Sequence, residues 1–209
     1  MKFIKIKLLV IAVIMFAASS AFASLSYDVT VDTSSLSGTT GYLYLQLNPN
    51  FGNTSDATAA VSNFASNGTL GATAPVVYGG NVSGTLPATV TFDNGYGTGF
   101  TQSGINDYNQ AITFGNSLSF HVVLNQILNN PATDGSSFTL SMFQDALGAT
   151  PLKTADGTMF TVNLNSDGTA TTVVADAGTT VNPTPIPAAA WLFGSGLMGL
   201  AGIRRRMAA

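Results

Sequence analysis

Hydrophobic and polar residues alternate in short runs along most of the chain, a pattern typical of strands that bury one face. In the first run, Tyr27, Val29 and Val31 share one face and polar residues share the other. The clearest run extends over 118–124. Further runs lie at 42–47, 60–64, 76–78, 82, 89–92, 112–114, 138–142, 160–164 and 169–174. The pattern predicts about eight to ten short strands.

Turn-forming residues separate these runs, and the intervals carry no convincing helical periodicity apart from one possible turn at 125–129. The stretch Asn165-Ser166-Asp167-Gly168 predicts a hairpin between the last two runs. Many short strands at this spacing predict an all-β body over 24–175. We expect an antiparallel β-sandwich or a jelly-roll-like fold.

The N-terminal segment, 1–23, has the features of a secretory signal peptide. A region with three lysines precedes the apolar stretch 8–18, and Ala21 and Ala23 form a small-x-small cleavage pattern. An uncleaved anchor is the alternative, but the apolar stretch is short for a membrane span. We therefore expect cleavage by signal peptidase and a mature chain that starts at Ser24.

The C-terminal segment changes composition twice. Residues 176–187 are rich in Gly, Thr, Asn and Pro and predict an extended linker. Residues 188–203 carry no charge and would give a helix of about 24 Å, slightly shorter than the roughly 30 Å hydrocarbon core. The basic residues in 204–209 would stay in the cytoplasm. We expect one transmembrane helix, with the body outside the inner membrane.

Charge is segregated along the chain, which excludes one class of function. Apart from Lys153, every Lys and Arg lies in the two terminal segments, whereas all ten acids are aspartates that lie between Ser24 and Val181. The net charge of residues 24–181 is therefore 1 − 10 = −9. Nucleic-acid binding requires clustered Lys or Arg, so we do not expect it. The absence of cysteine excludes disulfides and thiolate metal sites.

The glycines of the apolar segment spell G-x-G-x-x-G over 194–199. A dinucleotide-binding turn would need a preceding strand and an acid about 20 residues later, and the sequence ends ten residues after Gly199. Small residues spaced four apart, such as Ser195 and Gly199, instead fit close helix approach in a membrane.

Taken together, the proline motif, the string Trp191–Leu197 and the terminal arginines resemble a PEP-CTERM protein-sorting tail, also labelled the ice-binding-protein C-terminal domain. The matching positions are Pro183, Pro185, Ile186, Pro187, Trp191, Gly194, Gly196, Arg204, Arg205 and Arg206. Ile186 stands where the family motif has Glu. The resemblance implies a substrate of an exosortase-like transpeptidase in a Gram-negative bacterium, with the inner membrane and extracellular polysaccharide as further partners.

The body is similar, more loosely, to a family of exported PEP-CTERM proteins with uncharacterised β domains. The similar stretches are 31–34, 41–43, 48–49, 106–108, 114–120 and 150–152. This family carries no assigned activity, so the resemblance implies architecture only.

Candidate chemistry in the body is sparse. His121 is the single histidine and no G-x-S-x-G nucleophile motif is present, so we expect no enzyme, and a hydrolase with an acidic pair ranks last. Asn163, Asn165 and Asp167 follow the start of a calcium loop, although position twelve would be Val174. A cofactor is therefore not expected, with calcium as the weak exception.

Two further sets of residues are weaker candidates for binding. Asp93-Asn94 and Asn106-Asp107 form a second possible set of oxygen ligands in Gly-rich stretches. Four tyrosines could stack on sugar rings if they were exposed together, although covering a sheet face is the simpler interpretation. They are Tyr42, Tyr44, Tyr96 and Tyr108.

The order of signal, body, linker, apolar segment and arginines predicts a non-catalytic surface or extracellular-matrix protein. We expect it to be anchored for a time in the inner membrane and then placed at the cell surface or outside the cell. The alternative is a secreted carbohydrate- or calcium-binding β-sandwich module.

Overall fold

The computed structural model describes residues 24–49, 56–79, 81–94, 105–127 and 135–184. The predicted signal peptide with Ala21 and Ala23, the apolar segment 188–203 and the basic tail 204–209 lie outside these ranges, as do the sorting-motif positions after Thr184. No helix in the described ranges is long and apolar enough to span a membrane. Their one helix is a short 3-10 turn, η1 (Ser34–Leu36).

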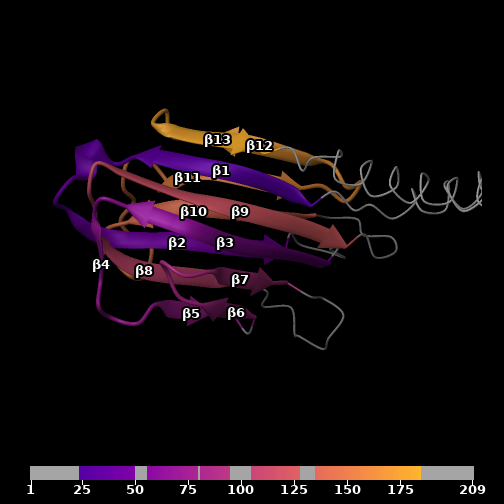
Figure 1. Cartoon of the computed structure of the whole chain (residues 1–209), viewed down its shortest axis with the longest axis horizontal. Helices are drawn as coiled ribbons and strands as arrows, with labels where there is room; N and C mark the ends of the chain where they lie inside the picture. The colour runs from indigo at the N-terminus through magenta and orange to yellow at the C-terminus, as the bar shows by residue number, and fades with distance from the viewer. Residues whose placement is uncertain (1–23, 50–55, 80, 95–104, 128–134, 185–209) are drawn as a thin grey trace, which may run out of the picture.

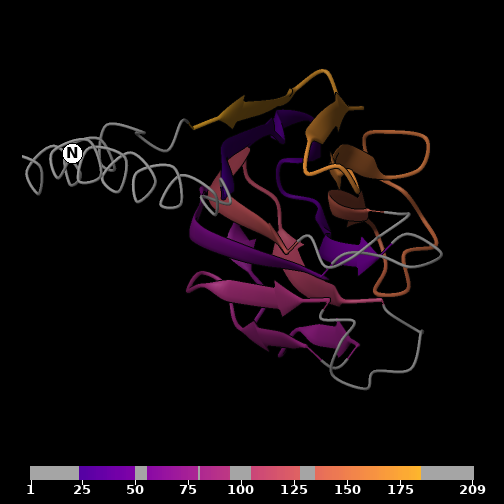
Figure 2. The same cartoon turned by 90° about the vertical axis from the view of Figure 1, so that its right-hand side faces the viewer.

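Two antiparallel sheets pack face to face and form a β-sandwich, which confirms the all-β prediction (Figures 1 and 2). Sheet A contains, in spatial order, β13 (Thr179–Pro183), β1 (Leu25–Asp32), β9 (Ser117–Ile127), β3 (Asp56–Ser66), β7 (Val90–Asp93) and β6 (Val82–Gly84). Sheet B contains β12 (Ala170–Val174), β11 (Thr158–Leu164), β10 (Ser136–Phe143), β2 (Thr40–Pro49), β8 (Asp107–Thr113) and β4 (Thr69–Leu70), and β5 (Val76–Tyr78) also pairs with β8.

The core lies between the sheets and is built by the alternation seen in the sequence. Every second residue of the clearest runs is buried, so each strand contributes one face. Phenylalanines connect the layers, because Phe138 of β10 lies 6.2 Å by ring centroid from both Phe92 of β7 and Phe160 of β11. Phe120 of β9 also contacts Phe160 across the layers, at 6.4 Å.

The thirteen strands of the described residues exceed the predicted eight to ten. The strands that match no predicted run are β4, which at two residues is too short for alternation to identify, and β13, whereas β5 and β6 fall on the runs predicted at 76–78 and 82. The run predicted at 60–64 is longer, because β3 extends over Asp56–Ser66 through an irregularity between Ser62 and Ala65. Asn63 takes a φ of 54° at this bulge.

The helical turn expected at 125–129 is wrong for its described part, because residues up to Ile127 belong to β9. The linker expected over 176–187 is also shorter than predicted. Residues 179–183 form β13, which pairs with β1 from Thr179↔Val31 to Pro183↔Tyr27. Pro183 is tolerated there because β13 lies at the edge of its sheet, where a missing N–H breaks no ladder on the outer side.

The two ends of the described body lie side by side. Thr184 N donates to Ser26 O at 2.8 Å, and Ser26 Oγ donates to Thr184 O at 2.9 Å. The antiparallel pairing of β1 with β13 therefore brings the first and last described residues to the same end of the sandwich.

Candidate functional site

The outer face of sheet B carries two buried polar residues, Asp107 and Asn109, which we call the β8 polar pair. They lie two residues apart on β8 and so point to the same side of the sheet. Tyr108 and Ile112, on the other side, belong to the hydrophobic core. The polar pair therefore points away from the core.

Strand register places side chains from two neighbouring strands around the polar pair. Asn109 lies opposite Tyr44 of β2 and Val76 of β5. Asp107 lies opposite Gln46 of β2 and Tyr78 of β5. Directly opposed residues have their Cβ atoms about 5 Å apart on the same face, so the surrounding side chains flank the pair on both sides.

Both members of the pair have hydrogen-bonding atoms without a partner. Asp107 Oδ1, Asn109 Oδ1 and Asn109 Nδ2 are buried and make no hydrogen bond. Asp107 is 9% exposed and Asn109 is 1% exposed. A buried polar group that stays unsatisfied costs roughly 1–3 kcal/mol, so this arrangement destabilises the fold.

Burial raises the pKa of Asp107, whereas hydrogen bonds from the side chains of Gln46 and Asn48 act to lower it. The pKa of Tyr44 is also raised, to about 12. Burial is the main cause, and the nearby ionisable side chains of Asp145, Tyr78 and Asp107 act in the same direction. The site therefore disfavours negative charge, and the one lysine among the described residues, Lys153, contacts Asp176 instead.

Asp107→Asn is expected to raise stability at pH 7 by about 1 kcal/mol, because a neutral amide replaces a buried carboxylate with an unpartnered oxygen. Since the pKa of Asp107 is raised in the folded state, the folded protein binds this proton more readily, and wild-type stability falls as pH rises above about 4. Urea unfolding at pH 3 and pH 7 measures both values. The gain in stability of Asp107→Asn over wild type should vanish at pH 3, where Asp107 is protonated. An equal gain at both pH values would show that the gain does not come from the ionisation of Asp107.

The four tyrosines named as a possible sugar platform do not all share one surface, and the simpler interpretation, that Tyr42 and Tyr44 cover a sheet face, is confirmed. Tyr108 is fully buried in the core, where its hydroxyl donates to Gln110 Oε1 at 3.0 Å and accepts from Leu86 N at 2.9 Å. Tyr42 and Tyr44 share the outer face of sheet B, and Tyr44 is only 5% exposed. Tyr96 lies outside the described residues. Tyr78 was not among these candidates, although it lies in the run predicted at 76–78.

The residues named as weak calcium candidates form the hairpin that the sequence predicted. Asn163 belongs to β11, where it pairs with Thr171. The turn that follows is held by its own side chains, since Asp167 Oδ1 accepts from Thr169 N at 2.9 Å and Asn165 Nδ2 donates to Thr169 Oγ1 at 2.9 Å. Gly168 adopts a φ of 84°, which favours glycine. The geometry is that of a β-turn and differs from an EF-hand loop.

The second proposed oxygen set is also used by the fold. Asn94 bridges the two sheets, with its side chain bonded to Ala57 N and Ser136 Oγ. Asn106 Nδ2 donates to Leu47 O at 3.2 Å. Within the described ranges, no three His, Asp, Glu or Cys side chains are grouped so that they could hold a metal ion.

His121 pairs with Asp28 across β1 and β9, with Nδ1 and Oδ1 2.7 Å apart. Ser62 of β3 lies opposite His121 on its other side, so three residue types of a hydrolytic triad are neighbours. The structure shows no hydrogen bond between His121 and Ser62, and the Asp28 side chain is 62% exposed. A triad requires a nucleophile bonded to its base and an aspartate held in place, and this surface arrangement provides neither.

Half of the described carboxylates outside the polar pair close turns. Four of them accept the backbone N–H two residues later at 2.9–3.0 Å, and each has a lowered pKa. They are Asp32, Asp145, Asp156 and Asp167. For Asp145, bonds from the backbone N–H groups of Ala149, Thr150 and Leu147 all favour the ionised form. Such short-range turns suit the short side chain of Asp better than that of Glu, which fits a body whose acids are all Asp.

A buried ion pair closes the far end of the sandwich. Lys153 Nζ lies 3.3 Å from Asp176 Oδ2, and each side chain is 10% exposed. Lys153 Nζ also donates to Asp32 O, and Asp176 Oδ2 accepts from Thr179 Oγ1 at 2.8 Å. The pair therefore connects the β10–β11 loop to the ends of β1 and β12.

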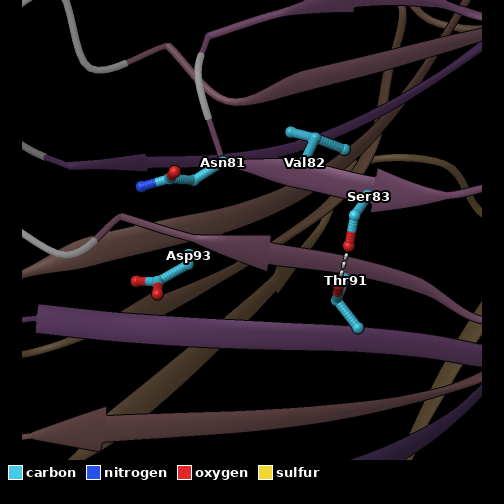
Figure 3. Close-up of a pocket in the computed structure, with 5 residues that line it drawn as sticks. All are labelled: Asn81, Val82, Ser83, Thr91 and Asp93. Atoms are coloured by element: carbon cyan, nitrogen blue, oxygen red, sulfur yellow. Dashed lines mark hydrogen bonds between the residues drawn. The ribbon is translucent and has the colours of Figure 1, made fainter.

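A separate recess of about 340 Å³ lies on the β6–β7 hairpin (Figure 3). It is lined by Asn81, Val82, Ser83, Thr91 and Asp93. The Ser83 and Thr91 hydroxyls bond to each other at 2.7 Å across the two strands. The recess is shallow and exposed, and the polar pair of β8 is the stronger candidate.

No protein-family model matches the chain, and neither the curated proteins nor the solved structures include a match to it.

Proposed function

We propose that the chain is an exported, non-catalytic protein of the cell surface or extracellular matrix. A cleaved signal peptide would carry the body across the inner membrane, and the apolar segment 188–203 would hold it there as a single transmembrane helix. An exosortase-like transpeptidase would then process the tail. The body would be a stable carrier of a binding surface.

The observation that carries this proposal is the order of segments in the tail. Prolines at 183, 185 and 187 precede an uncharged stretch that starts at Ala188 and ends at Arg204–Arg206. This order matches an extended spacer, a membrane anchor and a cytoplasmic stop signal.

The position of the two chain ends in the body supports the same proposal. Ser26 and Thr184 are hydrogen-bonded neighbours at one end of the sandwich, so a precursor could be joined to one membrane through both termini without strain in the body. Only four residues, 184–187, separate β13 from the apolar segment. Fully extended, they span at most about 14 Å, so the body would stay close to the membrane until the tail is cut.

The C-terminus of the mature protein tests the proposal. Protein secreted by the native host is expected to lack Trp191 and everything after it, as measured by intact mass. A Pro185→Ala/Pro187→Ala variant should keep the tail and stay in the membrane fraction. Secreted wild-type protein that retains Arg204–Arg206 would overturn the processing step.

A second candidate, binding of carbohydrate by the body, is favoured by one observation, the unpartnered polar pair beside exposed Tyr78. It is compatible with the first proposal, because a matrix protein needs a surface that recognises its matrix.

A further inference from the structure

We propose that the β8 polar pair, Asp107 and Asn109, forms the floor of a binding site for a neutral, hydroxyl-rich glycan, and that Tyr78 forms its side wall. The inference rests on the proposed function in one respect, since the body must be exported to meet such a polymer. It names the site and the ligand class of the second candidate function.

The unpartnered atoms match the hydrogen-bonding groups of a sugar ring. Asp107 Oδ1 and Asn109 Oδ1 can accept, and Asn109 Nδ2 can donate. Two residues apart on one strand, the side chains start about 7 Å from each other. Neighbouring ring hydroxyls each donate and accept, so a single sugar residue could satisfy both side chains at once.

The two tyrosines beside the polar pair differ in packing and exposure. Tyr44 is fixed, because its ring packs against Phe143 at 4.8 Å and its hydroxyl donates to Asp145 O at 3.3 Å. Tyr78 is 45% exposed and belongs to the three-residue strand β5. The unpartnered atoms of Asp107 and Asn109 are buried. A ligand therefore reaches them when Tyr78 turns outward, where its ring can stack on the apolar face of a sugar.

Charge favours an uncharged ligand over an ionic one. In the described part of the chain the single lysine, Lys153, is engaged with Asp176 at the far end of the sandwich. An anionic polymer would meet Asp107 and the net negative body without a compensating base. A divalent cation would find one carboxylate, and no described cluster of three acidic or imidazole groups surrounds it.

The cost of the pair to the fold supports a binding role. Three unpartnered buried atoms on two side chains of β8 destabilise the body, and no described residue forms a hydrogen bond with them. A ligand that fills these positions removes that cost, so binding should be accompanied by a gain in thermal stability.

The test uses the full-length chain in a zwitterionic detergent without a sugar headgroup. Native gels cast with dextran, xylan or hydroxyethyl cellulose test neutral glycans, and gels cast with alginate test an anionic one. Retardation by at least one neutral polymer is expected, and calorimetric titration with its oligosaccharides gives the affinity. Asp107→Asn and Asn109→Ala should weaken binding roughly tenfold or more. Tyr78→Ala should weaken it roughly threefold to tenfold.

Two controls separate binding from folding. Asp107→Asn is expected to be more stable than wild type at pH 7, so loss of binding by this variant cannot be attributed to unfolding. Asp93→Asn makes the same chemical change in the recess of Figure 3 and should bind like wild type.

Four results would each overturn the inference: no neutral polymer retards the protein, alginate alone retards it, a chelator abolishes binding, or Asp93→Asn loses as much affinity as Asp107→Asn. The mass of the C-terminus is independent of all four. A trimmed tail with no glycan binding would leave the sorting proposal intact and remove this one. Glycan binding by secreted protein that retains its tail would remove the sorting proposal and leave this one intact.

Discussion

Replacing Lys153 by methionine is expected to destabilise the folded body by about 3 kcal/mol. The side chains of Lys153 and Asp176 are each only 10% exposed, so the variant leaves a buried carboxylate without its cation. Methionine keeps most of the aliphatic length, and the loss therefore reports mainly the charge. Urea unfolding followed by circular dichroism measures it.

The double variant Lys153→Met/Asp176→Asn should recover much of this loss, since it removes the unpaired charge as well. His121→Ala provides the matched control, because it removes the side-chain partner of Asp28 at the surface, where Asp28 is 62% exposed. Its effect should stay below about 1 kcal/mol. A Lys153→Met effect as small as that of His121→Ala would show that the buried pair contributes nothing specific.

Phe138→Ala is expected to cost about 3–5 kcal/mol, the largest effect of any single change considered for this molecule. Phe138 is 0% exposed, and its ring contacts Phe92 of one sheet and Phe160 of the other. Truncation leaves a cavity at the point where the two layers meet, and neighbouring rings held by strand backbones cannot collapse fully into it.

Leu147→Ala is the control for Phe138→Ala, because Leu147 is 83% exposed in the β10–β11 loop. Its effect should stay within about 0.5 kcal/mol. The midpoint of thermal unfolding gives the same comparison. Equal shifts for the two variants would mean that the described sandwich interface is not the main source of stability.

The long strands could be predicted from the sequence because burial of one face imposes a period of two. The residues at 27, 29 and 31 and those at 118, 120, 122 and 124 are buried as the alternation requires. The hairpin at Asn165–Gly168 was also predictable, since its residues are those that a tight turn needs.

The two-residue strand β4 could not be predicted, because two residues contain no period, whereas β5 and β6 correspond to the weaker runs at 76–78 and 82. β13 was missed for a different reason. Its composition is that of a linker, and its strand conformation comes from pairing with β1, about 150 residues earlier in the chain. Long-range pairing of this kind overrides local composition.

The candidate site could be predicted only in part. The sequence drew attention to Asp107 as a possible ligand and to tyrosines as stacking groups. It could not show that Asn109 is buried without a partner. It also could not show that Tyr78 lies on the same sheet face as Asp107, whereas Tyr108 points into the core. Both facts depend on the register of β8 with β2 and β5, which no local pattern determines.

The edge position of β13 has a mechanical consequence for a body held by its tail. A pulling force that enters at Thr184 acts first on five residue pairs with a single neighbouring strand. These pairs would open in sequence from Ser26 inward, while the phenylalanine contacts between the sheets remain intact. The freed segment, about 20 Å when extended, would lengthen the connection to the membrane and lower the tension before the pulling force reaches the core.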